Sequence, residues 1–228
     1  MKLAIFSVSL PDWTPEEALP RMKSAGYDGV EWRVTDQKPA ADGKPSFWAG
    51  NRCTIPLSTF VDEAPRIKAL VAASGLAMPC LGTYAGCEDL SSVERGMKGA
   101  ALLGVKLLRV GSGGYDGKAP YKPLVEKAEG QYREVEALAK KHGVRALIEM
   151  HMNTLTPSAS SAATFVAGFA PKHVGVIYDV GNVVYEGYEQ YRMALEVLGP
   201  YLAHVHVKNA AWKGAPGAYG TWEWKAEA

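Results

Sequence analysis

Apolar residues recur along this chain in two patterns that alternate with each other. Short runs rich in aliphatic and β-branched residues predict buried strands. The intervals between them carry apolar residues at three- and four-residue spacings, which predicts amphipathic helices. The predicted strands are Lys2–Ser9, Tyr27–Trp32, Ala77–Leu81, Lys106–Val110, Val144–Glu149, Val174–Asp179 and Leu202–Val207, and the most regular helical patterns are Pro65–Ser74, Ser92–Leu103, Lys122–His142 and Glu189–Leu198.

The helix after the first predicted strand has clear signals at both ends. Thr14 is a suitable N-cap, Pro15 fits the first helical position, Glu17 completes a capping box and Gly26 ends the helix. A glycine followed by a short apolar run returns after later helical stretches, at Gly104 for example. The chain therefore repeats a unit of one strand and one helix.

Strands separated by helices predict an all-parallel sheet, which is either open and doubly wound or closed as a barrel. The open nucleotide-binding form normally has a glycine-rich phosphate loop after its first strand. Here residues 7–11 read Ser-Val-Ser-Leu-Pro. We therefore predict an α/β fold, a (βα)8 TIM barrel, as a single domain over residues 1–228, with its functional residues at the carboxyl ends of the strands.

Residues 33–60 form a connection that is too long for an ordinary loop of such a barrel. The segment contains several prolines and glycines together with Phe47 and Trp48. We expect a folded flap over the barrel mouth, that is, a long active-site loop. The alternative is a disordered surface insertion, because Ala40–Gly43 has little apolar content.

Composition and charge narrow the kind of ligand. The 228 residues are 47% hydrophobic and carry a formal net charge of +1, so a large core is available and no basic excess predicts nucleic acid or a membrane surface as partner. We expect a cytoplasmic protein with a small-molecule ligand. The sequence is also compatible with a homo-oligomer. Cys53, Cys80 and Cys87 form no metal-binding spacing and are predicted to be reduced structural thiols.

Ionisable residues gather at the ends of four predicted strands. Two carboxylates and an imidazole from successive strands, Glu149, Asp179 and His206, are plausible ligands for Mg²⁺, Mn²⁺ or Zn²⁺. A single strand-end aspartate is often only a helix cap, but the three together predict a metal site. His204 lies on the same face as His206, so the spacing does not choose between them; His206 is preferred because it lies nearer the strand end, which leaves His204 as a hydrogen-bonded core histidine.

Two further residue types bear on the substrate. Lys208 can hold a phosphate, a carboxylate or an enediolate oxygen as a point charge, although an ordinary surface lysine explains it equally well. Tryptophans near the predicted mouth, Trp32 and Trp48 among them, can form an apolar wall against the C–H face of a sugar or simply pack in the core.

With these strand ends, the chain resembles the xylose isomerase-like TIM barrels, a superfamily of sugar and sugar-phosphate isomerases and epimerases that also contains the endonuclease IV type of repair enzyme. The matching pieces appear in family order, and they are Gly26–Arg33, Ile148–His151, Tyr178–Asn182 and His206–Asn209. The resemblance implies a divalent-metal-dependent isomerase or epimerase. It acts on a small sugar, a sugar phosphate or a related keto or polyol compound.

The resemblance also implies roles for individual residues. Glu149, Asp179 and His206 would be the metal ligands, and Glu149 would also move a proton next to a metal-polarised carbonyl. The implied substrate-binding residues are His151, Glu31, Asn182, Lys208 and Trp32, with His151 contacting a substrate hydroxyl.

The chain departs from the family pattern in two respects. Asn182 stands where many relatives carry a histidine, and the third and fourth strand ends lack the histidines of the repair nucleases, so an endonuclease is not expected. The eighth unit, with a second glutamate, is missing, and Glu223 and Glu227 are doubtful substitutes. Either the sequence is a shortened version or the barrel closes differently; Ala215–Trp224, which reads as a mid-protein active-site loop, favours the first. A metal-dependent dehydratase of an inosose-like substrate and a non-catalytic sugar-binding barrel remain as alternatives.

Overall fold

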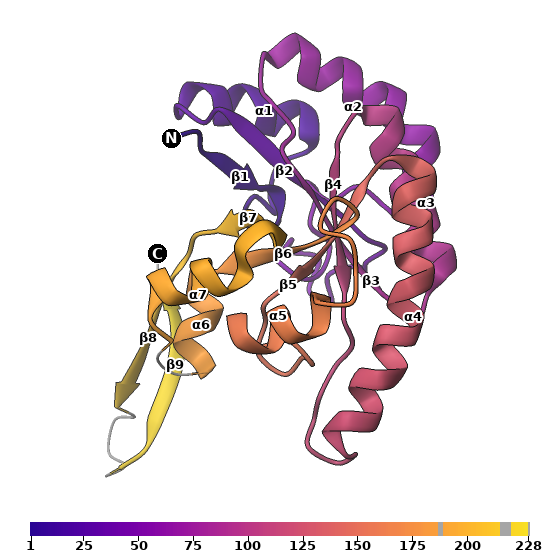
Figure 1. The fold of residues 1–228 in the computed structure, drawn as a ribbon. Coiled ribbons are helices and arrows are strands. Elements are labelled where there is room, and N and C mark those ends of the chain that lie inside the picture. The colour runs from indigo at the N-terminus through magenta and orange to yellow at the C-terminus, as the bar shows by residue number, and fades with distance from the viewer. Residues whose placement is uncertain (187–188, 215–219, 228) are drawn as a thin grey trace.

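Seven parallel strands in sequential order form the centre of the molecule (Figure 1). The computed structural model describes residues 1–186, 189–214 and 220–227. The strands are β1 (Ala4–Phe6), β2 (Gly29–Val34), β3 (Leu81–Gly86), β4 (Leu107–Gly111), β5 (Arg145–Glu149), β6 (Val174–Asp179) and β7 (Leu202–His206). This sheet with its connecting helices is a TIM barrel fold, in which the described residues form no full eighth unit, and this confirms the predicted fold class.

Helices connect the strands and cover the outer face of the sheet (Figure 1). They are α1 (Pro15–Ser24), α2 (Phe60–Ser74), α3 (Leu90–Leu103), α4 (Tyr121–His142), α5 (Ala159–Val166), α6 (Val180–Glu186) and α7 (Tyr191–Leu198), with short 3-10 helices η1 (Ser7–Ser9) and η2 (Gly199–Tyr201). The predicted capping box of α1 is confirmed: the Thr14 hydroxyl accepts from the Glu17 amide at 3.4 Å, and the Glu17 carboxylate accepts from the Thr14 amide at 2.9 Å.

The interior of the curled sheet has an apolar layer beneath a polar one. Cys80, Leu147 and Ile177 are fully buried and form a small cluster of their own. Because alternate residues of a strand share a face, Glu149 and Asp179 lie one layer nearer the strand ends than Leu147 and Ile177. The three cysteines are free and buried, as predicted for structural thiols.

The long connection between β2 and α2 folds back against the barrel. Ile55 pairs with Val34 in a parallel bridge, and its amide donates to the carbonyl of Arg33 at 3.0 Å. Asn51 is buried and donates to the carbonyl of Val8 at 2.9 Å. The segment is therefore folded, whereas a disordered insertion was the alternative from its composition.

Two predicted boundaries are wrong for physical reasons. The third strand begins at Leu81, where the prediction ended it, because Pro79 has no N–H for a ladder and Ala77 makes only an isolated bridge to Gly29. Helix α2 begins at Phe60 and not at Pro65, since the fully buried Phe60 ring draws the first turn into the core.

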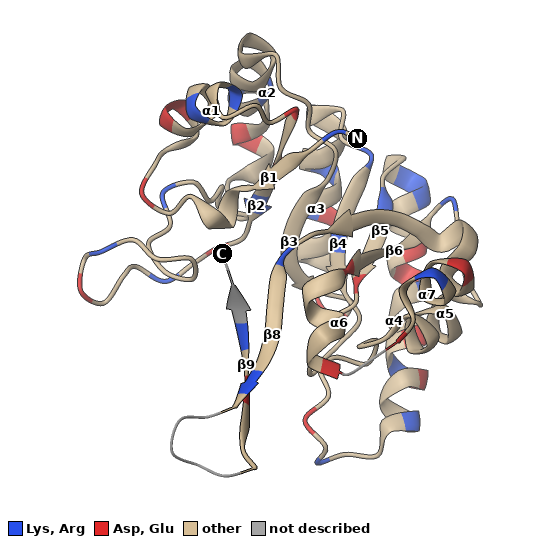
Figure 2. Ribbon diagram, turned by 90° about the vertical axis from the view of Figure 1, so that its left-hand side faces the viewer, with Lys and Arg blue, Asp and Glu red and all other residues tan. Residues whose placement is uncertain are grey.

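An antiparallel hairpin follows β7 and was not predicted. It pairs β8 (Asn209–Gly214) with β9 (Trp222–Glu227) and projects from the barrel (Figure 1, Figure 2). Of the expected active-site loop at Ala215–Trp224, residues 215–219 lie outside the described residues. In the part that the structure describes, no strand pairs with the outer edges of β1 and β7, and no helix is both long and apolar enough to cross a membrane.

Candidate active site

A hydrogen-bonded network of two carboxylates and two imidazoles occupies the carboxyl ends of the strands. The ring of His206 lies between Glu149, whose Oε1 is 2.8 Å from Nδ1, and Glu31, whose two oxygens are each 3.2 Å from Nε2. His204 Nε2 lies 3.0 Å from Glu31 Oε2. The network thus joins β2, β5 and β7 across the barrel interior.

The partners in this network shift each other's protonation. Burial alone would raise the pKa of Glu31, but hydrogen bonds from His204 and His206 outweigh it and lower that pKa to about 2. Burial would lower the pKa of His206, but its hydrogen bonds to Glu149 and Glu31 raise it to about 10. Burial also works against the charged form of Glu149, yet Arg109 and His206 hold its pKa well below the usual range. The site therefore pairs carboxylates with an imidazolium.

Asp179 is shared between a helix end and the site. Its Oδ1 accepts from the amides of Gly181 and Asn182 at 2.9 Å each, so it caps α6. Its Oδ2 lies 3.1 Å from Lys208 Nζ and 3.9 Å from His206 Nδ1. Burial raises the pKa of Asp179 despite the charge of Lys208. One oxygen of Asp179 therefore caps the helix, and the other faces the candidate site.

Glu149, Asp179 and His206 come together closely enough to hold one cation. One ligand atom from each of the three lies within 4.8 Å of the other two. His206 Nδ1 lies 2.8 Å from Glu149 Oε1 and 3.9 Å from Asp179 Oδ2. Two ligand bonds of about 2.0–2.2 Å to one divalent ion can bridge such separations, and two carboxylates with one imidazole suit the ions predicted from the sequence. Because Glu31 holds Nε2 of His206, Nδ1 is the nitrogen that faces the other two ligands. The donor set therefore fits a divalent metal, which would have to displace the Nδ1 proton.

Arg109 is a member of the site that the sequence reading missed. Its Nη1 donates to Glu149 Oε2, and its Nε donates to the carbonyl of Thr83 at 2.8 Å. Its guanidinium carbon lies 4.2 Å from the centre of the Tyr84 ring. The signal was present in the sequence, because Arg109 interrupts the apolar run of β4 on the face that points into the barrel.

Of the other predicted site residues, His151 and Asn182 form hydrogen bonds near the strand ends, and Trp32 lies in the core. His151 Nδ1 lies 2.8 Å from the Met152 carbonyl, which can only accept, so Nδ1 carries the proton. Asn182 is buried, donates to the Met150 carbonyl at 2.9 Å and accepts from Lys208 at 2.7 Å. The expectation for Trp32 is wrong: it lies on the opposite face of β2 from Glu31 and is fully buried, so it is a core residue.

Two glycines make room for these side chains. A Cβ at Gly181 would lie 2.3 Å from Cγ of Lys208, and a Cβ at Gly82 would lie 2.6 Å from the ring of Phe6 and 3.4 Å from Glu31. Any larger residue there would push Lys208 or Phe6 out of place. The second glutamate expected of the family is not supplied by Glu223, which pairs with Lys225 on the hairpin; the side chain of Glu227 lies outside the described residues.

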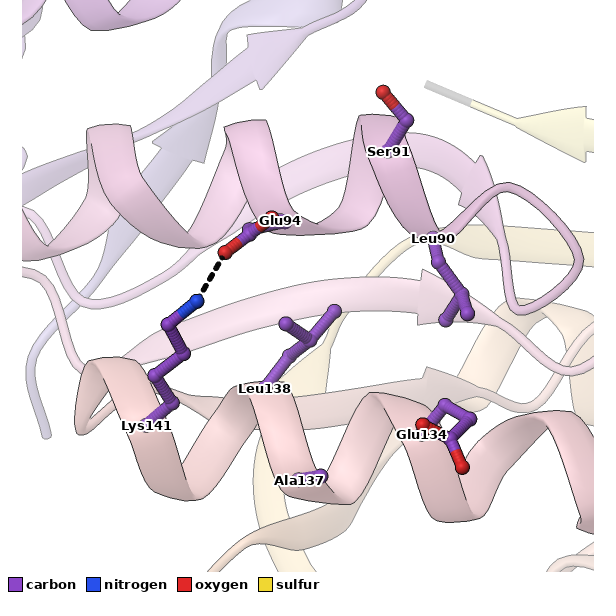
Figure 3. Close-up of a pocket in the computed structure, with 7 residues that line it drawn as sticks. All are labelled: Leu90, Ser91, Glu94, Glu134, Ala137, Leu138 and Lys141. Atoms are coloured by element: carbon purple, nitrogen blue, oxygen red, sulfur yellow. Dashed lines mark hydrogen bonds and ion pairs between the residues drawn. The ribbon is translucent and has the colours of Figure 1, made fainter.

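A separate groove lies on the outer surface, between α3 and α4 (Figure 3). Its walls are Leu90, Ser91, Glu94, Glu134, Ala137, Leu138 and Lys141. Glu94 and Lys141 close one end with an ion pair of 2.7 Å. None of the strand-end residues lines it, so the groove is distinct from the candidate site.

Comparison with known proteins decides the family. Residues 19–223 match the sequence model of the family described as "Xylose isomerase-like TIM barrel". The chain belongs to this family. A search of curated proteins finds no match.

Solved structures share the fold of this xylose isomerase-like chain at low sequence identity. The apo 3-keto-D-glucoside 4-epimerase YcjR of E. coli has a TM-score of 0.71 at 18% identity, over 92% of this chain and 79% of its own. D-psicose 3-epimerase of Clostridium cellulolyticum H10 with D-tagatose has a TM-score of 0.69 at 18% identity, over 90% and 72%. The IOLI protein with a bound zinc atom has a TM-score of 0.69 at 15% identity, over 97% and 77%. At these identities the likeness concerns the fold.

Proposed function

We propose that this xylose isomerase-like chain is a divalent-metal-dependent isomerase or epimerase of a small sugar, a sugar phosphate or a related keto or polyol compound. The observation that carries the proposal is the convergence of ligand atoms from Glu149, Asp179 and His206 within 4.8 Å of one another at the strand ends. The sugar epimerases among its structural relatives support the same class of substrate. The predicted cytoplasmic location stays an expectation.

The chain's own residues have distinct tasks in this proposal. A bound cation would polarise the substrate carbonyl and stabilise the charge that develops when the neighbouring C–H bond breaks. Nδ1 of His151 is hydrogen-bonded to the Met152 carbonyl, so Nε2 is the nitrogen that can accept a hydrogen bond from a substrate hydroxyl. Lys208 has a partly exposed side chain and can turn from Asp179 to a substrate oxygen. In an isomerisation Glu149 takes the proton from the carbon next to the carbonyl and returns it to the former carbonyl carbon, whereas an epimerisation needs a second proton donor on the opposite face of the substrate.

Proton transfer requires a rearrangement at Glu149. Both of its oxygens accept hydrogen bonds in this structure, one from His206 and one from Arg109. A carboxylate held in this way is a weak base. A metal held by His206 Nδ1 would take the place of the proton that His206 gives to Glu149, so Oε1 would lose this hydrogen bond and could ligate the ion. Glu149 would then act as a base through Oε2, which would have to leave Arg109.

Isotope exchange tests the proposal. The full chain, stripped with a chelator and reloaded with Mn²⁺, Mg²⁺ or Zn²⁺, is incubated in D₂O with ketoses, ketose phosphates and inososes. We expect deuterium at the carbon next to the carbonyl, and Glu149→Gln should slow its entry by about 10²- to 10⁴-fold. Glu196→Gln, on the exposed face of α7, is the matched control and should leave the rate unchanged.

Mass analysis of the same reactions separates the alternatives. Isomerisation conserves the mass of the substrate apart from the isotope, whereas a dehydratase product has lost water. If the chain binds metal through Asp179 but no substrate gains deuterium or loses water, the enzyme proposal fails and a sugar-binding barrel is supported instead.

A further inference from the structure

Arg33 is a buried arginine with no acidic partner in the described part of the chain. Its side chain is on the inward face of β2, two residues beyond Glu31, and the residue is 4% exposed. Its Nη1 donates to Gln37 Oε1 at 3.1 Å and to Thr54 Oγ1 at 2.9 Å, both neutral groups. Its Nε is buried and has no hydrogen-bond partner.

This arrangement is costly unless an anion completes it. Arginine stays charged in proteins, and burying a guanidinium without a counter-charge opposes folding. Arg109 has such a counter-charge, because it forms an ion pair with Glu149. Arg33 gains a counter-charge only if a negative group from outside the described residues binds to it.

Aromatic rings surround this charge on the side toward solvent. The guanidinium carbon of Arg33 lies 5.2 Å from the centre of the Tyr84 ring and 5.9 Å from that of Trp48. The two rings meet edge to face, with centroids 6.4 Å apart. Tyr84 is 44% exposed and Trp48 is 66% exposed. An arginine beneath exposed rings offers both a charge and an apolar surface to one ligand.

We propose that Arg33, Tyr84 and Trp48 form a subsite for an anionic group, a phosphate or a carboxylate, on the sugar that reacts at Glu149. This deepens the proposed function and rests on it. The planar guanidinium binds either oxyanion through paired N–H groups, and the rings pack on the C–H face of the sugar. Trp48, Gln37 and Thr54 all belong to the segment between β2 and α2, so that segment would cover the bound anion.

If Arg33 had only a structural role, its replacement would affect the substrates differently. Through Gln37 and Thr54 it also anchors the segment between β2 and α2. If anchoring were its only role, its loss would impair all substrates equally. If it binds an anion, its loss impairs anionic substrates alone.

The test compares three matched probes in the isotope-exchange reaction of the metal-loaded full chain: a ketohexose, its phosphate ester and the corresponding keto-hexose acid. We expect kcat/KM for one of the two anionic probes to exceed that of the neutral sugar by about 10- to 100-fold. Arg33→Gln should remove this preference through KM, Arg33→Lys should keep part of it, and Arg66→Gln on the surface of α2 should not change it. The phosphate and acid probes tell which oxyanion is the natural one.

Two results would overturn the inference. If Arg33→Gln lowers the rates of neutral and anionic probes by the same factor, Arg33 is an anchor and the proposed function stands without the subsite. If no probe exchanges deuterium at all, the proposed function has failed, and a titration with inorganic phosphate followed by tryptophan fluorescence decides separately. Phosphate binding that is lost in Arg33→Gln and only weakened in Arg33→Lys supports the anion subsite, and binding that neither variant changes refutes it.

Discussion

At the scale of single residues, Glu31 sets the orientation of His206, a ligand of the proposed metal site. Its carboxylate is hydrogen-bonded to Nε2 of His206 and to Nε2 of His204. Because Nε2 of His206 is engaged in this way, only Nδ1 faces Glu149 and Asp179. A carboxylate that orients a metal-binding imidazole in this way also makes it a better ligand. Glu31 is therefore a positioning residue of the proposed metal site.

Replacing this carboxylate should weaken metal binding. We expect Glu31→Gln to raise the Kd for Mn²⁺ or Zn²⁺ by about 10- to 100-fold, because His206 loses a charged partner. Competition with a chromogenic chelator measures the effect. Glu63→Gln, which removes only an exposed partner of Arg66, serves as the control. An unchanged affinity in Glu31→Gln would show that His206 needs no such support.

The sequence predicted which residues gather at the strand ends but not all of their directions. Glu149, Asp179 and His206 could be named because a parallel barrel brings its strand ends together. Trp32 was misplaced because one strand alternates its faces, so an inward Glu31 makes its neighbour face the helices. Arg109 was missed although it interrupts an apolar strand, because its partner Glu149 lies 40 residues away and only the fold brings the two together.

At the scale of elements, periodicity located most helices and strands, and local chemistry decided the boundaries. The helical spacing of Lys122–His142 corresponds to α4 with one residue added, because it is long and regular. Pro79 and the buried Phe60 moved the start of β3 and α2. The β8–β9 hairpin was not predicted, because the pattern of its aromatic residues is equally typical of a loop.

Two glycines inside helices provide a matched test of packing between elements. A Cβ at Gly99 of α3 would lie 2.3 Å from the Phe60 ring of α2, whereas a Cβ at Gly130 of α4 would meet nothing within 4 Å. Gly99→Ala should lower the free energy of unfolding by about 1–3 kcal/mol through overpacking. Gly130→Ala should raise it by about 0.5–1 kcal/mol through helix propensity. Urea denaturation measures both, and a stable Gly99→Ala protein would contradict the tight α2–α3 contact.

At the scale of the whole molecule, side chains and not a backbone ladder connect the two ends of the sheet. No ladder joins β1 to β7 in the described residues. The Phe6 and His206 rings stack across this seam with centroids 6.0 Å apart. The hydrogen bonds of His204 and His206 to Glu31 cross it as well. The candidate site is therefore also part of what closes the barrel.

A bound metal should consequently stabilise the whole fold. At a free concentration of 100 times Kd, a ligand that binds only the folded chain adds about 2.7 kcal/mol to its stability. We expect the Tm to rise when Mn²⁺ or Zn²⁺ is added to chelator-treated protein and to fall again with excess chelator. Asp179→Asn should abolish the rise. A Tm that does not respond to metal in the parent chain would argue against the site.

The seam between β1 and β7 has a consequence for the life of the protein in a cell. Since the hydrogen bonds across it belong to the candidate site, a metal bound there would oppose local opening of the chain and should slow its proteolysis. The amount of intact protein would then follow the supply of metal and substrate, without any dedicated regulator. A substitution at the seam would then change the lifetime of the protein in the cell as well as its catalytic rate, because Glu31 and His206 contribute to the closure of the seam and to the candidate site.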